Sequence, residues 1–572
     1  MQKYDYPNTP QSNIIIDLQY GGEVITSWIE VINNYEIKGY RLSKTAAGNR
    51  HSYFHTKFSK PFKTYGIAVD DNIQQGKRAE GKNIKMYVQF DNPGEVLVKT
   101  GLSHVSTDGA LKNLQSEIPD FDFKKIHKAA RTAWLNELAK IDVEGSVPSK
   151  ADESAFAANG NNNRPIKKTV TPDLAALKLK SFYTALYHTM LTPTIGSDID
   201  GQYRIIDNKL STAQGFTYYD VSGFNSEYDA KYQLLTLTDP IRTAEMIKSY
   251  LASESTDTAG YIIPFIADAL TKGIKEFDTI QAYNKIKALV NSNTGGREGY
   301  RKNGFVSSVV PGAVNKTLRY AYQDWCIAQM AKTLNNNSDQ IEYLVRAQNW
   351  KNLHNKQSNI KIPVKDDWLV PYDISTVAEY SGGKEKLEAR LDEVFFGEPT
   401  DAAKFKGKYD EANVFANYMP YLYSFTSAPQ KTQQAISRII NSYTTTPGGL
   451  QANDSRGQQS AWYVLSSLGI YNIAPGQPLY NIGLPQFNKA VINFDNDKTF
   501  TITNAGAVLS RNNLYIQGLN LDKNGYDKLY INYQDTMKGG DLEIFTGTLP
   551  NKLVMQALEK PVLKVTAVAL KR

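Results

Sequence analysis

The stretch PGGLQANDSRGQQSAWYVLSSLGIYNIAPGQPLYNIGLPQF, residues 447–487, decides the fold of this chain. In it a glycine-flanked loop with Asn453, Asp454 and Ser455 precedes a segment with the apolar pattern of a helix. Asn and Asp favour turns and helix N-caps, because their side chains accept hydrogen bonds from nearby backbone N–H groups. Two interpretations of Asp454 therefore stay open: it caps the helix, or it presents an acid at the helix start for chemistry.

Helical patterns dominate before this stretch, from about residue 174 to residue 470. Ten or more apolar-periodic segments are joined by loops, among them LAALKLKSFYTALYHTML and VNKTLRYAYQDWCIAQMAKTL. Such an array is typical of a solenoid or of a closed helical toroid. No repeat of about 20 to 50 residues is visible, and this disfavours the solenoid.

Strand patterns occupy both ends of the chain. Residues 12 to about 105 contain short segments rich in β-branched and aromatic residues, such as NIIIDLQY and IKMYVQF, between Gly, Asn and Pro turns. This spacing predicts an antiparallel sandwich. A helical period follows in DFKKIHKAARTAWLNELAKI, and strand patterns return in the last part of the chain, with segments such as TFTITN and KLYINY.

The expected fold class is therefore multidomain α+β, since 572 residues exceed what one hydrophobic core usually organises. Residues 1–144 are predicted to form an N-terminal β-sandwich with a trailing helix. Residues 145–172 carry almost no large apolar side chains and are predicted to be a linker. Residues 173–480 then form the helical domain, and residues 481–572 form a small C-terminal β-domain.

Composition excludes several classes of function. The 65 Lys and Arg against 58 Asp and Glu give a net charge of +7 without a dense basic block, so nucleic acid is a poor candidate partner. Cys326 is the only cysteine, which rules out an intrachain disulfide and a thiolate metal site. The 36 tyrosines suit stacking on sugars or packing in a β-sandwich, and composition does not separate these two roles.

The sequence leaves the compartment open. No apolar run reaches the roughly 18 residues of a membrane helix, and the N-terminus MQKYDYPNTPQSNIIIDL lacks the apolar core of a signal peptide. Either the chain is cytoplasmic, or a leader is absent from this sequence and the protein is periplasmic or secreted.

The 447–487 stretch resembles the most characteristic segment of glycoside hydrolase family 92, the calcium-dependent, exo-acting α-mannosidases. Other segments resemble the family in the expected order, including GLSHVSTDGALKNLQSEIPDFDF at 101–123 and FYTALYHTMLTPTIGSDIDGQYR at 182–204. The resemblance covers nearly the whole chain. It implies that the helical domain is an (α/α)6 barrel and that the partner is a carbohydrate, an α-mannoside or related glycan. Family members usually begin earlier, so we expect either a truncated N-terminus or a more open pocket.

The resemblance also implies the chemistry of an inverting glycosidase. Such an enzyme needs a carboxylic acid that protonates the leaving oxygen and a carboxylate that activates water across a gap. The implied general base is Asp454, but Ser455 stands where the family has a second acid, and a hydroxyl cannot replace a carboxylate as base. The implied general acid falls at Ile360 or Lys361, so the neighbouring Asp366 and Asp367 are the substitute candidates.

The family's Ca²⁺ site is also altered. A hard cation needs many oxygen ligands; Asn413 persists as a candidate metal ligand, whereas Val414 replaces a glutamate, and Asn417 and Tyr418 replace two histidines. Ca²⁺ is thus expected from the family but poorly supported by these residues. The remaining candidates are substrate-binding residues: Asn453, Ser455, Gln458, Trp462, Asp198, Asp200 and Asp373. Each has a structural alternative as a helix cap, a packed core residue or a loop clamp.

The sequence leaves three alternative functions. The first is a divergent exo-α-mannosidase-like glycoside hydrolase with Asp454 as base. The second is a non-catalytic relative that binds α-mannosides or another glycan, since the acid and much of the calcium site are altered. The third is a barrel redirected to another glycoside, or to a substrate whose good leaving group needs little acid catalysis.

Overall fold

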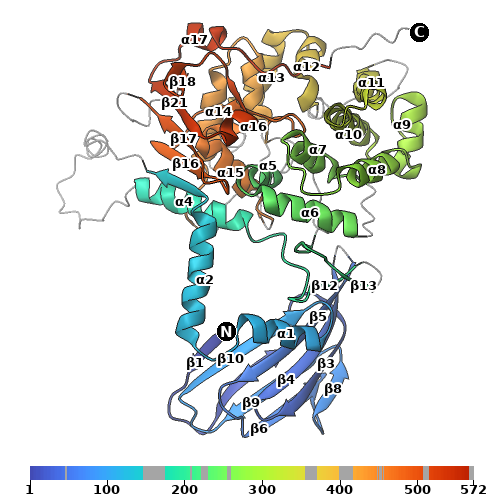
Figure 1. The fold of residues 1–572 in the computed structure, drawn as a ribbon, viewed down its shortest axis with the longest axis vertical. Coiled ribbons are helices and arrows are strands. Elements are labelled where there is room, and N and C mark those ends of the chain that lie inside the picture. Colours follow the sequence, from blue (N-terminus) through green and yellow to red (C-terminus); the bar gives the residue numbers. More distant parts are fainter. Residues whose placement is uncertain are drawn as a thin grey trace, which may run out of the picture. The chain divides into compact units, whose positions relative to one another are not determined.

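The computed structural model describes most of the chain, and its contacts divide it into two compact units (Figure 1). The described residues are 1–45, 48–145, 174–205, 209–220, 230–253, 259–354, 370–397, 417–446, 449, 454, 456–506 and 515–565. The first unit comprises Met1–Glu137, Pro193–Gly223 and Lys248–Ser255, and the second comprises Leu138–Thr192, Phe224–Ile247 and Thr256–Arg572.

The first unit contains the predicted antiparallel sandwich. One sheet has six strands in the order β1-β10-β5-β4-β3-β8, and the other has four in the order β2-β9-β6-β7. The strands are β1 Gln2–Asp5, β2 Ser12–Asp17, β3 Glu23–Asn33, β4 Glu36–Thr45, β5 Gly48–Phe58, β6 Thr64–Val69, β7 Asn72–Gln74, β8 Arg78–Gly81, β9 Ile84–Phe90 and β10 Glu95–Ser103. Alternate side chains such as Ile29, Ile37 and Val88 are buried in one core, which is what the period-two pattern predicts.

Two helices follow the sandwich. In α1, Thr107–Glu117, the Oγ of Ser106 caps the start by accepting a hydrogen bond from Gly109 N at 2.9 Å. This helix lies on β10 and β5 at Gly101, where a Cβ atom would come within 2.0 Å of the Ala110 carbonyl oxygen. Glycine is therefore required at this point of the sheet. The predicted helix after it is α2, Phe123–Leu138.

The second unit is built mainly from helices, as predicted (Figure 1). They are α4 Leu174–Thr189, α5 Ala230–Thr238, α6 Pro240–Ala252, of which the last residues belong to the first unit, α7 Ile263–Thr271, α8 Thr279–Val290, α9 Arg297–Asn303, α10 Ala313–Thr333, α11 Asn337–Arg346, α12 Ile374–Tyr380, α13 Lys384–Phe395, α14 Lys431–Ile440 and α15 Gln458–Leu468. The predicted helix around MPYLYSF is a 3₁₀ helix, η7 Met419–Phe425, with Pro420 in its first turn. Proline has no N–H to donate, so it is tolerated there.

Strands complete the second unit. A six-stranded sheet has the order β11-β16-β17-β21-β18-β19, and a three-stranded sheet has the order β14-β15-β20. Their bounds are β11 Ile141–Glu144, β14 Ile470–Tyr471, β15 Leu479–Ile482, β16 Lys489–Asn493, β17 Thr499–Asn504, β18 Tyr515–Leu521, β19 Asn524–Gly525, β20 Tyr530–Asn532 and β21 Gly540–Gly547. Strand β11, which lies within the predicted 1–144 domain, pairs with β16 in this sheet, with Ile141 opposite Ile492. The multidomain α+β class is confirmed, whereas the exact domain boundaries stay predictions.

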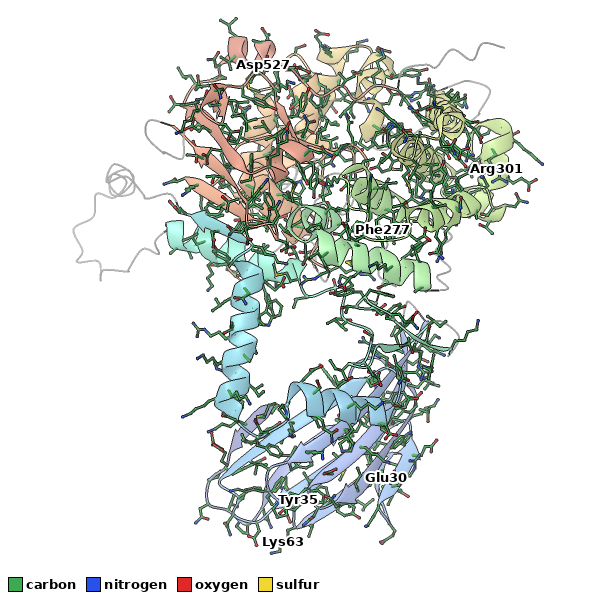
Figure 2. All side chains as sticks on the ribbon, in the orientation of Figure 1. Glu30, Tyr35, Lys63, Phe277, Arg301 and Asp527 are labelled. Atoms are coloured by element: carbon green, nitrogen blue, oxygen red, sulfur yellow. The ribbon has the colours of Figure 1, made fainter. Side chains whose placement is uncertain are left out.

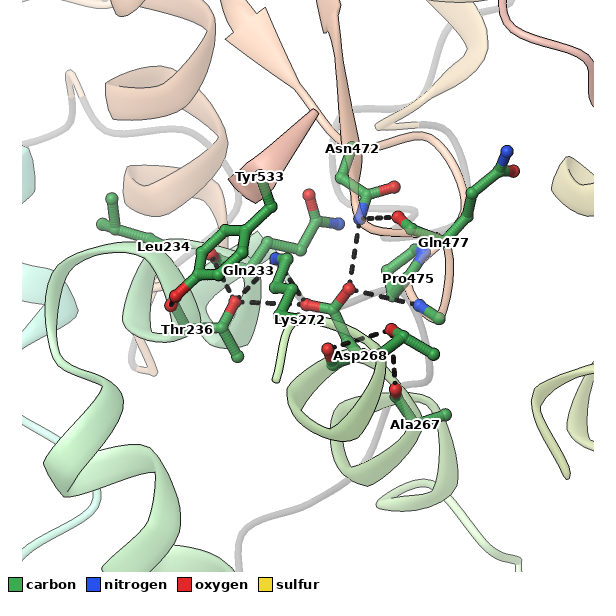
Figure 3. A network of polar contacts seen from close by, with 12 residues as sticks. Gln233, Leu234, Thr236, Ala267, Asp268, Lys272, Asn472, Pro475, Gln477 and Tyr533 are labelled. Atoms are coloured by element: carbon green, nitrogen blue, oxygen red, sulfur yellow. Dashed lines mark hydrogen bonds and ion pairs between the residues drawn. The ribbon is translucent and has the colours of Figure 1, made fainter. Parts of the chain in front are cut away.

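A buried ionic network joins the helices to the segment after α15 (Figure 3). The Nζ of Lys272 lies 2.7 Å from Asp268 Oδ2, and both side chains are almost completely buried. Thr236 Oγ1 donates to the same carboxylate oxygen at 3.1 Å. Asn472 Nδ2 and Gly476 N donate to the other oxygen, each at 3.2 Å. Both carboxylate oxygens are thereby satisfied away from water, which is the condition under which a buried charge is tolerated.

Figure 2 labels Lys63, Phe277 and Asp527, which differ in exposure. Lys63 in the first unit and Asp527 in the second are exposed, whereas Phe277, just before α8, is buried. Lys63 pairs with Asp91 at 2.9 Å, an exposed contact of the kind that contributes little stability. The cores, and not such surface pairs, hold each unit together.

Candidate functional site

The loop before α15 holds the carboxylate of Asp454 in a fixed position. Its Oδ1 accepts a hydrogen bond from Gln459 N at 3.0 Å, and its Oδ2 accepts one from Ser460 N at 2.8 Å. The carbonyl oxygen of Asp454 also accepts one from Gly457 N at 3.2 Å. Asp454 lies before the N-cap residue Gly457, and its carboxylate satisfies two N–H groups in the first turn of α15. These hydrogen bonds do not exclude chemistry, since each carboxylate oxygen can accept more than one hydrogen bond.

Gly457 makes the turn into α15 possible. Its φ is +77°, a left-handed conformation that favours glycine, and a Cβ atom there would lie 2.6 Å from the His188 carbonyl oxygen. The turn therefore lies directly against the end of α4. Asn453 and Ser455, the neighbouring substrate-binding candidates, lie outside the described residues.

The two candidates on α15 itself are buried. Gln458 lies in the first turn of the helix. Trp462 is almost fully buried, its Nε1 donates to the Asn417 carbonyl oxygen at 2.7 Å, and its ring stacks near Tyr443 at 6.5 Å between centroids. The indole therefore fixes α15 to the segment before η7. Its role in binding substrate stays a prediction.

Two buried polar groups that the sequence analysis did not select occur near these elements. The side-chain amide of Asn417 is 0% exposed, and both its nitrogen and its oxygen lack a hydrogen-bond partner among the described residues. The hydroxyl of Ser460 is in the same situation. Buried polar atoms are normally satisfied by protein or water, so these groups are where a bound polar molecule would be stabilised. The only sequence signal was that Asn417 stands at a position where the family has histidine.

In the first unit, Asp198 belongs to a loop clamp, a set of hydrogen bonds that holds residues 198–204 against residues 103–113. Its Oδ2 accepts a hydrogen bond from Ser103 Oγ at 2.7 Å, and its Oδ1 accepts one from Asn113 Nδ2 at 2.9 Å. A Cβ atom on Gly109 would come within 2.1 Å of Asp198 Oδ2, so the helix approaches the carboxylate as closely as its backbone allows. These contacts are those of the structural alternative for Asp198, a side chain 6% exposed.

Asp200 and Arg204 continue this clamp. Lys112 Nζ donates to Asp200 Oδ2 at 2.8 Å, and this hydrogen bond lowers the pKa of Asp200. Arg204 Nε donates to the His104 carbonyl oxygen at 2.8 Å, and its Nη2 donates to the Val105 carbonyl oxygen at 3.1 Å. Asp200 is the more solvent-accessible of the two candidate aspartates and the better placed of them to meet a ligand.

The tight approach at Gly109 gives a stability prediction. Gly109→Ala is expected to destabilise the first unit by about 1–3 kcal/mol, because the methyl group forces Asp198 or Ser103 to move. The matched control is Gly299→Ala in α9, where a Cβ atom meets nothing within 4 Å and alanine should stabilise the helix by about 0.5–1 kcal/mol. Thermal unfolding of both variants tests this, and equal shifts for the two would contradict the clamp.

Asp373 lies at the junction of a short 3₁₀ helix and α12. Its side chain is 0% exposed, and its Oδ1 accepts hydrogen bonds from Thr376 Oγ1 at 2.7 Å and from Val565 N at 3.1 Å. Burial raises the pKa of Asp373. The acid candidates Asp366 and Asp367 and the metal-ligand candidate Asn413 lie outside the described residues. Their distances from Asp454 accordingly stay predictions.

The described residues around α15 offer few ligands for Ca²⁺. Ca²⁺ takes about six to eight oxygen ligands, usually with several carboxylates. The described oxygens on α15 and on the segments next to it include one carboxylate, Asp454, together with the Asn417 amide and the Ser460 hydroxyl. In the described part of the chain no three His, Cys, Asp or Glu side chains form a group that could hold a metal ion. These residues alone do not fit Ca²⁺, so no catalytic step is derived through it.

None of the described helices combines sufficient length with sufficient apolar character to cross a bilayer.

Family models match almost the whole chain. The glycosyl hydrolase family 92 N-terminal domain matches residues 1–103. The glycosyl hydrolase family 92 catalytic domain matches residues 109–367 and 362–548.

Solved structures agree with this assignment. A family 92 α-mannosidase from Bacteroides thetaiotaomicron is similar with a TM-score of 0.85 and 28% sequence identity, over 97% of this chain and 78% of that chain. A family 92 inverting mannosidase from the same organism is similar in fold, with a TM-score of 0.84 and 24% identity over 98% of this chain and 81% of that one.

A curated fungal relative from Arthroderma benhamiae, described as an uncharacterized secreted glycosidase, is 22% identical over 540 residues. The match covers 81% of this chain, which spans 62% of the length of that relative. The two family models together cover far more than half of the residues. The chain belongs to glycosyl hydrolase family 92.

Proposed function

We propose that the protein is an inverting glycoside hydrolase that releases mannose from α-mannosides or related glycans, with Asp454 as general base. The observation that carries this proposal is the carboxylate of Asp454, held by two backbone N–H groups at the start of α15. Two backbone N–H groups fix the orientation of this carboxylate, and each of its oxygens can accept a further hydrogen bond. A carboxylate oriented in this way can accept a proton from a water molecule placed beside it.

Membership of the family supports the substrate class. One related structure is that of an α-mannosidase in complex with mannoimidazole, at 28% identity to this chain. The buried amide of Asn417 supports a polar ligand near α15, since no described residue gives it the hydrogen bonds that a sugar hydroxyl offers. The fungal relative is named a secreted glycosidase, which supports a periplasmic or secreted location for this protein.

In the proposed reaction Asp454 removes a proton from a water molecule as that water attacks the anomeric carbon. The leaving oxygen is protonated by a second carboxylic acid, for which Asp366 and Asp367 are the candidates. In an inverting enzyme the two carboxyl groups lie about 6.5–9.5 Å apart, so that water fits between them and the sugar. Both acid candidates belong to the chain segment before Asp373.

A second candidate function is a glycan-binding relative with impaired catalysis. Ser455 replaces one acid of the expected pair, and Ile360 or Lys361 stands at the expected general acid. A hydroxyl cannot replace a carboxylate as base, and an aliphatic or ammonium side chain does not protonate a leaving group as a carboxylic acid does near neutral pH. This candidate predicts measurable binding of mannoimidazole without turnover of mannosides.

Assays with two substrate classes test the proposal. The purified protein is expected to release mannose from aryl α-mannosides and from α-mannobioses, and Asp454→Ala is expected to abolish this release. Turnover of aryl mannosides alone would favour a barrel redirected to substrates with good leaving groups. Glycan binding without any turnover would refute the hydrolase and support the second candidate.

Calcium dependence is a separate measurement. The same assays are run with added Ca²⁺ and with a chelator. Val414 replaces a glutamate, and Asn417 and Tyr418 replace two histidines, so we expect a weaker response to the chelator than a complete Ca²⁺ site would give. Release that the chelator abolishes would contradict this expectation and would require ligands from outside the described residues.

A further inference from the structure

A buried lysine contacts the loop that carries Asp454. Lys231 lies in α5 and is 6% exposed. Its Nζ donates to the Arg456 carbonyl oxygen at 2.9 Å and to Thr192 Oγ1 at 3.2 Å. Thr192 Oγ1 in turn donates to the Arg456 carbonyl oxygen at 3.4 Å. Two segments more than 200 residues earlier in the chain therefore meet at one carbonyl of this loop.

The other side of the loop is fixed as well. Gly457 packs against the end of α4, where a Cβ atom would approach His188 O to 2.6 Å and Thr189 Cα to 2.7 Å. Asp454 ties the loop to the first turn of α15 through its two hydrogen bonds. The backbone between Asp454 and α15 is thus held by α4, by α5 and by α15 itself.

The choice of lysine at this position is informative. Burying an ammonium group costs free energy unless hydrogen bonds replace its water, and an apolar side chain of similar length would pack without that cost. Most neighbours of Lys231 on α5 are also buried, so solvent does not account for the charge. Among its contacts with described residues, the ammonium makes a directed hydrogen bond to the carbonyl two residues after Asp454, which methionine would not make.

We propose that Lys231 is a positioning residue for Asp454: its ammonium group fixes the Arg456 carbonyl and so sets where the carboxylate stands. This inference rests on the proposed function, in which Asp454 activates water. Proton transfer to a base depends steeply on geometry, and a displacement of about 1 Å can cost about 100-fold in rate. Lys231 would act on catalysis only through Asp454.

A double-mutant cycle separates positioning from a general structural role. The hydrolysis of 4-methylumbelliferyl α-mannoside is measured for the wild type, Lys231→Met, Asp454→Asn and the double variant. Lys231→Met is expected to lower kcat by about 10- to 100-fold with KM changed less than about threefold. In the Asp454→Asn background the same substitution is expected to lower kcat less than about twofold, because the base that Lys231 positions is no longer there. An equal loss in both backgrounds would overturn the proposal.

Two further variants serve as a second test and as a control. Thr192→Val removes the second hydrogen bond to the Arg456 carbonyl oxygen. It is expected to lower kcat less than Lys231→Met does, and to leave kcat unchanged in the Asp454→Asn background. An equal loss of kcat in both backgrounds would overturn the proposal, and this test remains available if Lys231→Met does not fold. Lys275→Met removes an exposed lysine of the same unit and is expected to leave kcat unchanged.

A readout independent of turnover separates this proposal from the proposed function. Hydrogen exchange is followed in the peptide covering residues 456–465, which contains the two amides that Asp454 caps. Lys231→Met is expected to accelerate this exchange by about tenfold relative to Lys275→Met, because the loop loses a fixing contact. Unchanged exchange would overturn the positioning role whether or not the protein hydrolyses mannosides. Faster exchange in a protein without turnover would support the positioning of Asp454 and refute only the hydrolase.

Discussion

Asp454→Asn is expected to lower kcat for α-mannoside hydrolysis by about 10²–10⁴-fold while shifting the melting temperature by less than about 3 °C. An amide cannot accept a proton from water, so general-base catalysis is lost. Asparagine keeps one side-chain oxygen, so it can still accept a hydrogen bond from one of the two backbone N–H groups that bind the carboxylate, those of Gln459 and Ser460. The change therefore removes the chemistry of this position and keeps part of its structural role.

A comparison with Asp454→Ala separates the loss of the base from the loss of the hydrogen bonds. Alanine removes both the base and the hydrogen bonds to Gln459 N and Ser460 N, so it is expected to lower stability by about 0.5–2 kcal/mol in addition to the loss of rate. If Asp454 had only a structural role, the loss of kcat would follow the loss of stability, and asparagine would lower kcat less than alanine does. Rates and melting temperatures of the three proteins distinguish these outcomes.

The local parts of the fold were predictable from sequence. The strands of the sandwich follow from alternating side chains, as in β9, where Ile84, Met86, Val88 and Phe90 all face the core. Long-range pairings were not predictable in this way. Strand β11 pairs with β16, in which Glu144 is opposite Lys489, because a four-residue strand carries no local signal of its partner. Only the folded chain defines that sheet.

The same distinction applies to the candidate site. The loop sequence NDS indicated that Asp454 lies just before a helix, either as a cap or as a catalytic acid, because turn and cap preferences are local properties. Lys231 could not be selected, because it reaches the loop from 225 residues away and its position in α5 looks like an ordinary buried helical turn. Trp462 was selected as a substrate-binding residue, but the sequence could not reveal that its Nε1 bonds to the Asn417 carbonyl oxygen.

The largest effect on stability is expected at the buried ion pair of α7. Lys272→Met is expected to lower the free energy of unfolding of the helical unit by about 3–5 kcal/mol, because it leaves the Asp268 carboxylate buried without its cation. Thr236, Asn472 and Gly476 would still donate to that carboxylate, but neutral donors offset only part of the cost of a buried charge. Urea unfolding followed by the far-UV circular dichroism of the helices measures the loss.

The network also explains why this single pair matters for the whole unit. Asp268 accepts hydrogen bonds from Asn472 and Gly476, which lie beyond α15, so its carboxylate joins α7 to a segment about 200 residues later (Figure 3). Lys275→Met, an exposed change three residues after Lys272, is expected to alter stability by less than about 0.5 kcal/mol. The double variant Asp268→Asn with Lys272→Met removes both charges and should be more stable than Lys272→Met alone. The opposite result is that the losses in free energy of unfolding of the two single variants add up to the loss of the double variant. That result would show that the two charges do not interact and that the cation has no role in joining the two segments.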